Sequence, residues 1–300
     1  MQPLDQFARA IARHAPADGT WDCLIPGVRL IRASQPTMPM PVIYEPTMCF
    51  VAQGRKRALL GDMTYVYDAA SYLVASVGLP VIGSVIEASE AAPYLCLQLD
   101  LDRGELGEVA AAHPRSASTS QGDEQGLTLG RTTPALLDCV VRLVGLLDSP
   151  DDIDALAPLI TREILYRLLT GPDGGVIRSM TQADSRLNQI ARAILWIREH
   201  FREAYRIKDA ADVAHMSLSS FHQHFKAITG MSPLEFRTHL RLQEARRLMV
   251  AEARDAASAG FEVGYGSPSQ FSRDYARLFG APPATHAAQL RGDAAGPAAP

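Results

Sequence analysis

The chain has 300 residues, 47% of them hydrophobic, and this length predicts two domains of ordinary size. It contains no apolar run of about eighteen residues and no apolar leader followed by a cleavage site, which argues against a membrane-spanning or secreted protein. We therefore expect a cytoplasmic protein without a membrane partner. The four cysteines, at positions 23, 49, 96 and 139, lack the close spacing of a zinc site and are expected to be reduced thiols.

The net charge of −4 is unevenly distributed along the chain. Residues 184–300 hold 15 basic and 12 acidic side chains, whereas residues 1–183 hold 14 and 21. The C-terminal third is therefore the part suited to a polyanion, although only mildly. Any affinity for DNA must depend on where its arginines lie rather than on bulk charge.

The period of the hydrophobic pattern changes early in the chain. Residues 3–15 have apolar side chains at helical spacing, which predicts a short leading helix. Between about residues 21 and 101, seven or eight short runs rich in β-branched and aromatic residues are separated by Gly, Pro, Asp or Ser. This spacing predicts short antiparallel strands in a barrel or jelly roll, with a hairpin turn at Gly61-Asp62.

Such a barrel raises the question of metal catalysis, because many barrels hold a transition metal on clustered histidines and a carboxylate. None of the eight histidines lies within the predicted strands. A site made only of carboxylates is conceivable, but the same residues read more readily as charges at turns and rims: Glu45, Asp62, Glu87, Asp100 and Asp102. Asp100 and Asp102 alternate with leucines, which predicts one polar strand face rather than an acid–base pair. We find no catalytic constellation.

In the last predicted strand, Tyr94, Cys96 and Gln98 point away from the leucines. If that face lines the interior, it forms a small effector pocket of mixed polarity that contains a thiol, and Cys49 from another run could join it. The alternative is that both cysteines are small buried hydrophobic residues.

Helical periodicity resumes after a stretch rich in small residues, in which residues 113–126 predict a flexible loop. Residues 134–148 and 153–170 have apolar positions at i, i+3, i+4 and i+7, which predicts an antiparallel helical hairpin. A proline and three glycines in residues 170–175 end it, and a short linker follows. Asp184 or Ser185 caps the next predicted helix. The small residues of 292–300 predict a disordered tail.

The clearest feature is an internal repeat, in which residues 207–237 overlie residues 257–287 at an offset of fifty without gaps. Each copy reads as two short helices joined by a tight turn. The second helix begins at an N-capping serine, Ser217 or Ser267, and ends at a glycine suited to positive φ, Gly230 or Gly280. The pattern predicts two helix-turn-helix units, whose second helices lie in the major groove of DNA.

Two stretches carry a family resemblance: RLQEARRLM between the copies, and VGYGSPSQFSRDYARLFGAPP in the second copy. Over residues 184–291 the chain resembles the AraC family of bacterial transcription regulators. The resemblance implies an α+β protein with a cupin-like effector-binding and dimerisation domain at 1–178 and a double helix-turn-helix domain at 184–291. It implies as partners double-stranded DNA, RNA polymerase, a small-molecule effector and a second copy of the chain. It implies neither enzymatic activity nor a cofactor or metal; the alternative is a cupin-type metalloenzyme with a DNA-binding tail.

In the resembled family, a helix pair like that at 134–170 dimerises the effector domain. The resemblance therefore implies an interface at or near Leu136, Val140, Leu143 and Leu147. A helix pair packed only on its own barrel would produce the same apolar pattern.

Outward positions of the two recognition helices supply the candidate DNA contacts. The expected base contacts are Ser219, His222 and Gln223 in the first helix, and Ser269, Gln270 and Arg273 in the second. The expected phosphate contacts are Ser217, Lys226, Ser267 and Arg277. Arg273 is the strongest base reader, because a guanidinium can bind guanine O6 and N7 together and the resembled family has an arginine aligned there. The first helix begins with serines where the family often has larger residues, so we expect it to read fewer bases.

Overall fold

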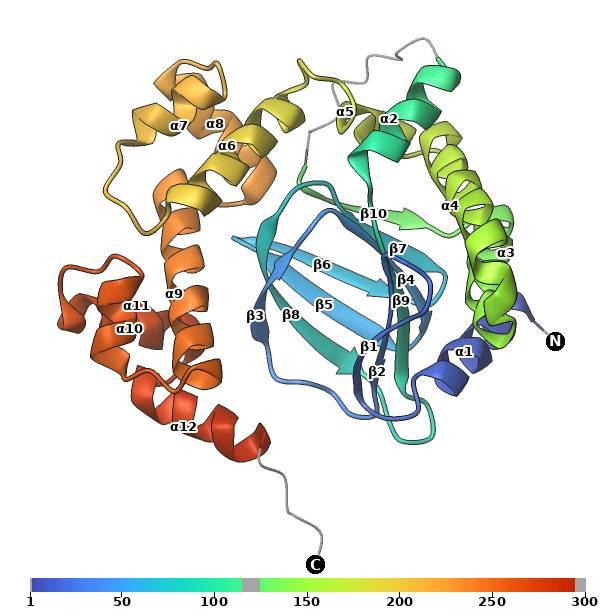
Figure 1. Cartoon of the computed structure of the whole chain (residues 1–300), viewed down its shortest axis with the longest axis horizontal. Helices are drawn as coiled ribbons and strands as arrows, with labels where there is room; N and C mark the ends of the chain where they lie inside the picture. Colours follow the sequence, from blue (N-terminus) through green and yellow to red (C-terminus); the bar gives the residue numbers. More distant parts are fainter. Residues whose placement is uncertain (1, 115–124, 295–300) are drawn as a thin grey trace, which may run out of the picture.

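The computed structural model describes residues 2–114 and 125–294. The N-terminal part combines β-sheets with flanking helices, and the C-terminal part is helical (Figure 1). Within the described residues, no helix is long and apolar enough to cross a membrane.

The strands form two antiparallel sheets. The six-stranded sheet has the order β1 (Gly19–Asp22), β2 (Val28–Ala33), β9 (Tyr94–Asp100), β4 (Thr47–Gln53), β7 (Ser71–Ala75) and β10 (Leu127–Arg131). The four-stranded sheet has the order β3 (Met40–Tyr44), β8 (Leu79–Glu87), β5 (Arg55–Leu60) and β6 (Met63–Asp68). The predicted turn at Gly61-Asp62 is confirmed, since Leu60 pairs with Met63 across it.

Of the two expected architectures, a barrel or a jelly roll, a closed barrel is excluded, because among the described strands no hydrogen-bonded ladder joins the two sheets. Alternating side chains identify strands but leave their closure open, since closure depends on strand tilt and register. One run read as continuous, residues 42–54, is split at Glu45-Pro46 into β3 and β4, which belong to different sheets.

The N-terminal helices cover the outer face of the larger sheet (Figure 1). They are α1 (Pro3–His14), α2 (Arg103–Ala112), α3 (Pro134–Gly145), α4 (Ile153–Thr170) and α5 (Gly174–Ser179), with short 3₁₀ turns at Leu146–Asp148 and Pro150–Asp152 between α3 and α4. The leading helix and the helical hairpin are thus confirmed. The expectation that Asp102 shares a strand face with Asp100 is wrong: Asp102 caps α2, accepting a hydrogen bond from the Glu105 amide at 2.7 Å.

The sequence analysis missed α2, β10 and α5, and the seven or eight expected runs are nine strands, β1 to β9, in the structure. The loop expected at 113–126 falls mostly on residues 115–124, outside the described residues.

The C-terminal helices are α6 (Arg186–His200), α7 (Ile207–Val213), α8 (Leu218–Thr229), α9 (Pro233–Ala251), α10 (Ala256–Glu262), α11 (Pro268–Phe279) and α12 (Pro283–Ala294). Ser185 caps α6, which confirms one of the two expected caps. The expected start of the tail at residue 292 is too early, because α12 continues to Ala294; residues 295–300 lie outside the described residues.

Two hydrophobic cores divide the molecule unevenly. The first includes the sheet interior, α1, α3, α4 and the buried faces of α6 to α8, ending at Leu240 on α9. The second begins at Leu242 on the same helix and includes α10, α11 and α12. The first helical repeat therefore shares its core with the sheets, whereas the second has its own.

The sheets and the first repeat meet at a docking seam, formed by Leu60–Gly61 and Gly126 on one side and Ile228–Gly230 on the other. The Gly126 amide donates a hydrogen bond to the Ile228 carbonyl at 3.0 Å. A Cβ added at Gly230 would lie 2.5 Å from the Leu60 carbonyl oxygen, so the two backbones are in direct contact. Beside the seam, Arg198 of α6 donates two hydrogen bonds of 2.6 Å to the Glu45 carboxylate.

Candidate DNA-binding and effector sites

The first helix pair, α7 and α8, is held by aromatic packing. Phe221 and Phe225 are buried on α8 with ring centroids 5.3 Å apart, and Phe225 packs edge-on against Phe236 of α9. The Ser217 hydroxyl oxygen accepts a hydrogen bond from the Ser220 amide at 3.3 Å, and Gly230 ends the helix with φ of 70°. Both predicted caps are confirmed. The buried face fixes which side of α8 points outward, and there the exposed side chains are Ser219, His222, Gln223 and Lys226.

The second pair, α10 and α11, repeats this construction. Phe271 and Tyr275 are buried with centroids 5.6 Å apart, Ser267 accepts a hydrogen bond from the Gln270 amide at 3.5 Å, and Gly280 has φ of 78°. The exposed outward side chains are Ser269, Gln270, Arg273 and Arg277. Arg277 donates a hydrogen bond to Asp274 at 2.9 Å. Arg273 forms no hydrogen bond or ion pair with any residue that the structure describes, so its guanidinium is available to a ligand.

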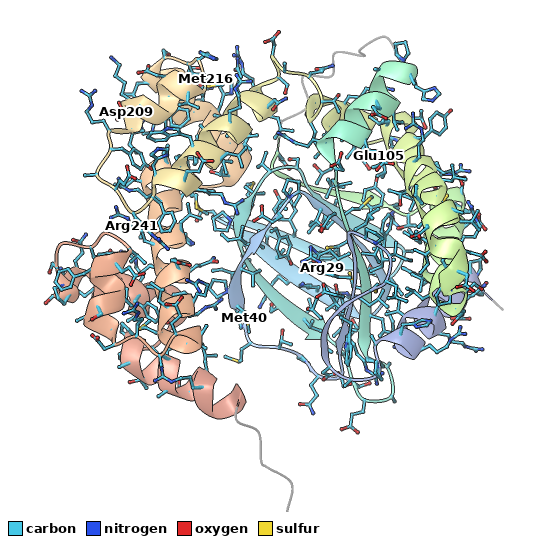
Figure 2. All side chains as sticks on the ribbon, viewed as in Figure 1. Arg29, Met40, Glu105, Asp209, Met216 and Arg241 are labelled. Atoms are coloured by element: carbon cyan, nitrogen blue, oxygen red, sulfur yellow. The ribbon has the colours of Figure 1, made fainter. Side chains whose placement is uncertain are left out.

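Arg241, on α9 between the two pairs, is a residue whose role sequence reasoning missed (Figure 2). Its guanidinium donates to the Phe201 carbonyl at 2.6 Å, the Gly264 carbonyl at 2.8 Å and the Glu203 carbonyl at 3.2 Å. Burial lowers its pKa, although the group remains charged. The guanidinium group thereby links the end of α6 to the turn between α10 and α11, and this link fixes the two helix pairs relative to each other.

The predicted pocket residues lie on the strand faces that point between the two sheets. Cys49 pairs with Gln98 and Val51 with Cys96 across β4 and β9, which puts both cysteines, Gln98 and Tyr94 on one face. Cys49, Cys96 and Tyr94 are buried, and Gln98 is half-buried. The expectation that these four side chains share a face is therefore met.

Three further residues of this interior were missed: Lys56 on β5, Tyr67 opposite it on β6, and Tyr44 on β3. The Lys56 ammonium lies 5.5 Å from the Tyr44 ring centroid and 6.0 Å from that of Tyr94. A signal was present in the sequence, because strand alternation puts Lys56 on the same face as the buried residues Ala58 and Leu60.

The pKa values in this interior reflect enclosure and mutual influence. Burial raises the pKa of the Tyr67 and Tyr94 hydroxyls well above the usual value. For Cys96, burial alone would raise the pKa, but the neighbouring Cys49 and Tyr94 groups and the positive charge of Lys56 outweigh it and lower the pKa. The tyrosines are therefore neutral hydroxyl groups at physiological pH.

The predicted dimerisation residues are not surface residues. Leu136, Val140 and Leu143 are buried within this chain and Leu147 is half-buried, so the first three cannot meet a second copy in this conformation. Helical periodicity had marked the face that packs on the sheet. The apolar surface of the hairpin lies instead on α4, where Leu156 and Leu159 are 42% and 64% exposed.

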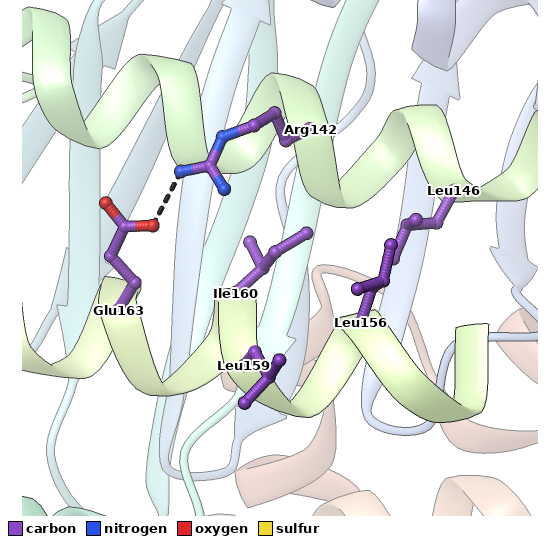
Figure 3. A pocket seen from close by; sticks show the side chains of 6 residues that line it. All are labelled: Arg142, Leu146, Leu156, Leu159, Ile160 and Glu163. Carbon is purple, nitrogen blue, oxygen red and sulfur yellow. Dashed lines mark hydrogen bonds and ion pairs between the residues drawn. The ribbon is translucent and has the colours of Figure 1, made fainter. Parts of the chain in front are cut away.

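These two leucines line a groove of about 370 Å³ between α3 and α4, together with Leu146 and Ile160. Figure 3 shows that an ion pair closes one end, where Arg142 donates to Glu163 at 2.6 Å. Hydrogen bonds from Arg142 and Arg167 lower the pKa of Glu163 to about 2, so this pair is charged at neutral pH.

Three of the carboxylates considered for a metal form ion pairs with arginines. Glu45 pairs with Arg198, Asp100 with Arg29, and Glu87 with Arg55. In residues 2–114 and 125–294, no three His, Cys, Asp or Glu side chains gather into a group that could hold a metal ion.

Comparison with known proteins gives two family matches. Residues 24–176 match the N-terminus of AraC-type transcriptional regulators, and residues 210–289 match a helix-turn-helix domain. The HTH-type transcriptional activator RhaS of Salmonella schwarzengrund is 30% identical over 152 residues, which are 50% of this chain and 53% of RhaS. The chain thus spans about half the length of the curated relatives it matches.

Solved structures of ToxT from Vibrio cholerae share the whole fold at low identity. The unsaturated fatty acid-bound form has a TM-score of 0.54 at 12% identity and covers 89% of this chain and 95% of ToxT. The form bound to a methylnaphthalenyl butenoic acid has a TM-score of 0.56 at 11% identity, with coverage of 88% and 98%. Since the family match to residues 24–176 extends over half of the sequence and a helix-turn-helix match follows it, the chain belongs to the AraC-type transcriptional regulators.

Proposed function

We propose that this protein is a one-component, sequence-specific transcription regulator. Two helix-turn-helix units in a domain at 184–291 bind double-stranded DNA, and an open, cupin-like domain at 1–178 binds a small organic effector. The observation that carries the proposal is the repeated outward face of α8 and α11, where polar side chains surround a buried aromatic pair at equivalent positions. The family match favours this regulator over a metalloenzyme with a DNA-binding tail.

The two recognition helices divide the work of binding. Ser219, His222 and Gln223 on α8, and Ser269, Gln270 and Arg273 on α11, contact base edges in successive major grooves. The phosphate contacts are Lys226, Arg277 and the hydroxyl groups of Ser217 and Ser267. Each capping serine uses its oxygen as an acceptor within the helix, which leaves its hydroxyl hydrogen to donate to a phosphate.

The regulator acts in the cytoplasm as a homodimer and engages RNA polymerase once bound to DNA. For the dimer we propose the groove between α3 and α4, because Leu156 and Leu159 are the exposed apolar side chains of this hairpin's groove. Two copies meeting there would remove apolar surface from water, which stabilises association.

The DNA proposal is tested by a randomised-site selection with the wild-type chain and two variants. Arg273→Ala is expected to cost roughly 1–3 kcal/mol and to relax the preference at one base pair, because its guanidinium has no protein partner in the described residues and is available to a guanine. Lys226→Ala is the matched control on α8, expected to weaken binding to all sequences alike. If Arg273→Ala keeps the wild-type preference at every position, the assignment of α11 to base reading fails.

A further inference from the structure

The interior between the sheets contains a positive charge without a negative partner. Lys56 is half-buried, and its ammonium group lies near the Tyr44 and Tyr94 rings. Burial lowers its pKa, and the neighbouring Tyr44, Cys49 and Cys96 groups more than compensate, so that the pKa lies above its usual value. No carboxylate is among the groups that act on it. The raised pKa means that these neighbours favour the ammonium form, so Lys56 carries a positive charge at neutral pH.

Around this ammonium, the polar groups are donors that lack acceptors. Among the described residues, the hydroxyl groups of Tyr44, Tyr67 and Tyr94 have no hydrogen-bond partner. Buried hydroxyl groups are nearly always hydrogen-bonded in folded proteins, so three in one place require an explanation. An ammonium and three neutral hydroxyl groups together need a partner that accepts hydrogen bonds and carries negative charge.

The walls of this region are suited to an organic ligand. Tyrosine rings come from both sheets, and Gly83 on β8 lies against Lys56: a Cβ there would be in van der Waals contact with Lys56 Cε at 3.5 Å and with the Tyr44 hydroxyl oxygen at 3.4 Å. On the same face of the larger sheet, the deep residues Cys96 and Tyr94 are buried, whereas Gln98 is half-buried. The polar cluster therefore extends from a closed interior towards a more exposed edge.

We propose that the effector is a small organic monocarboxylic acid, whose carboxylate pairs with the Lys56 ammonium and accepts hydrogen bonds from the hydroxyl groups of Tyr44, Tyr67 and Tyr94. This inference rests on the proposed effector function and specifies its ligand class. One ammonium balances one negative charge, which favours a carboxylate over a phosphate ester. The aromatic rings then contact the hydrocarbon part of the acid.

The test uses the full chain and two matched pairs of probes: benzoate against benzyl alcohol, and octanoate against octanol. Calorimetry and thermal unfolding are expected to show that at least one acid binds and raises the Tm, while its alcohol binds far more weakly. Lys56→Met is expected to weaken acid binding roughly a hundred-fold, because the carboxylate loses its buried partner. Lys208→Met, at an exposed lysine of α7, is the control and is expected to leave acid binding unchanged.

A second readout separates a ligand-binding lysine from a structural one. Without ligand, Lys56→Met is expected to lower the Tm, because the raised pKa of Lys56 means that its ammonium form stabilises the fold. Added acid is expected to raise the Tm of the wild type but not that of Lys56→Met. The inference is overturned if neither acid binds, if an alcohol binds as well as its acid, or if Lys56→Met retains acid binding. DNA binding by the same samples is measured in parallel. Failure of the proposed regulatory function can then be distinguished from failure of the proposed ligand class.

Discussion

The two C-capping glycines of the repeat permit a matched experiment on the docking seam. Gly230 and Gly280 end equivalent helices with nearly the same φ, 70° and 78°. An alanine in this left-handed region costs about 1–2 kcal/mol. At Gly280 nothing lies within 4 Å of an added Cβ, so Gly280→Ala measures that backbone cost alone.

Gly230→Ala is expected to be more damaging, because its Cβ would lie 2.5 Å from the Leu60 carbonyl oxygen. The two nearest atoms, the carbonyl oxygen and carbonyl carbon of Leu60, belong to the backbone, so the seam must open rather than a side chain move. Overpacking of this kind adds about 1–3 kcal/mol to the same backbone cost. With about 2–4 °C lost per kcal/mol in a domain of this size, Gly230→Ala should lower the Tm roughly 1.5 to 4 times as far as Gly280→Ala.

The assay combines thermal unfolding with hydrogen exchange at the Gly126 amide, which donates to the Ile228 carbonyl across the seam. Exchange at Gly126 should accelerate in Gly230→Ala and stay unchanged in Gly280→Ala. Equal Tm losses in the two variants, with Gly126 equally protected, would refute direct contact between the sheets and the first repeat.

Two further predictions address how the repeats and the subunits are held. Arg241→Lys removes the guanidinium that bonds to both the Phe201 and the Gly264 carbonyls. Inserting one base pair between the two halves of a selected DNA site should therefore cost the variant less binding affinity than it costs the wild type. An equal loss of affinity in both proteins would mean that Arg241 does not set the spacing. Leu159→Lys should convert a dimer to a monomer in analytical ultracentrifugation, because it puts a charge into the apolar groove. The equally surface-exposed Leu195 of α6 supplies the control, Leu195→Lys, and a monomeric wild type or a dimeric Leu159→Lys would rule out this interface.

Local patterns in the sequence predicted the strands and the helical repeat, because each depends on neighbouring residues. Ser217 and Gly230 act on the ends of their own helix, so their roles follow from spacing alone. β10 was missed because a five-residue run becomes a strand only by pairing with β7, a tertiary event. α2 was missed because its glycines and alanines gave no amphipathic signal.

The errors in the candidate sites have a common physical origin. Helical periodicity identified the buried face of α3, which includes Leu136, but it does not say which surface covers that face. In the structure, that surface belongs to the same chain. For Lys56, the charge suggested the surface, although strand alternation put it on the interior face. The Arg241 hydrogen bonds and the docking seam both join residues that are far apart in sequence. No local sequence pattern can therefore predict these contacts.

The division of the hydrophobic cores has a consequence for chimeric regulators. A cut at residue 184, where the DNA-binding domain begins in sequence, would separate α6 to α8 from the sheets with which they share a core. A cut within α9, between Leu240 and Leu242, follows the boundary between the two cores instead. Recombination there would exchange the second recognition helix alone and keep the first with its own effector domain. The two halves of the binding site can then diversify at different rates, since the second has a hydrophobic core of its own and meets the sheets at few points, such as the hydrogen bond from Arg246 to the Pro41 carbonyl.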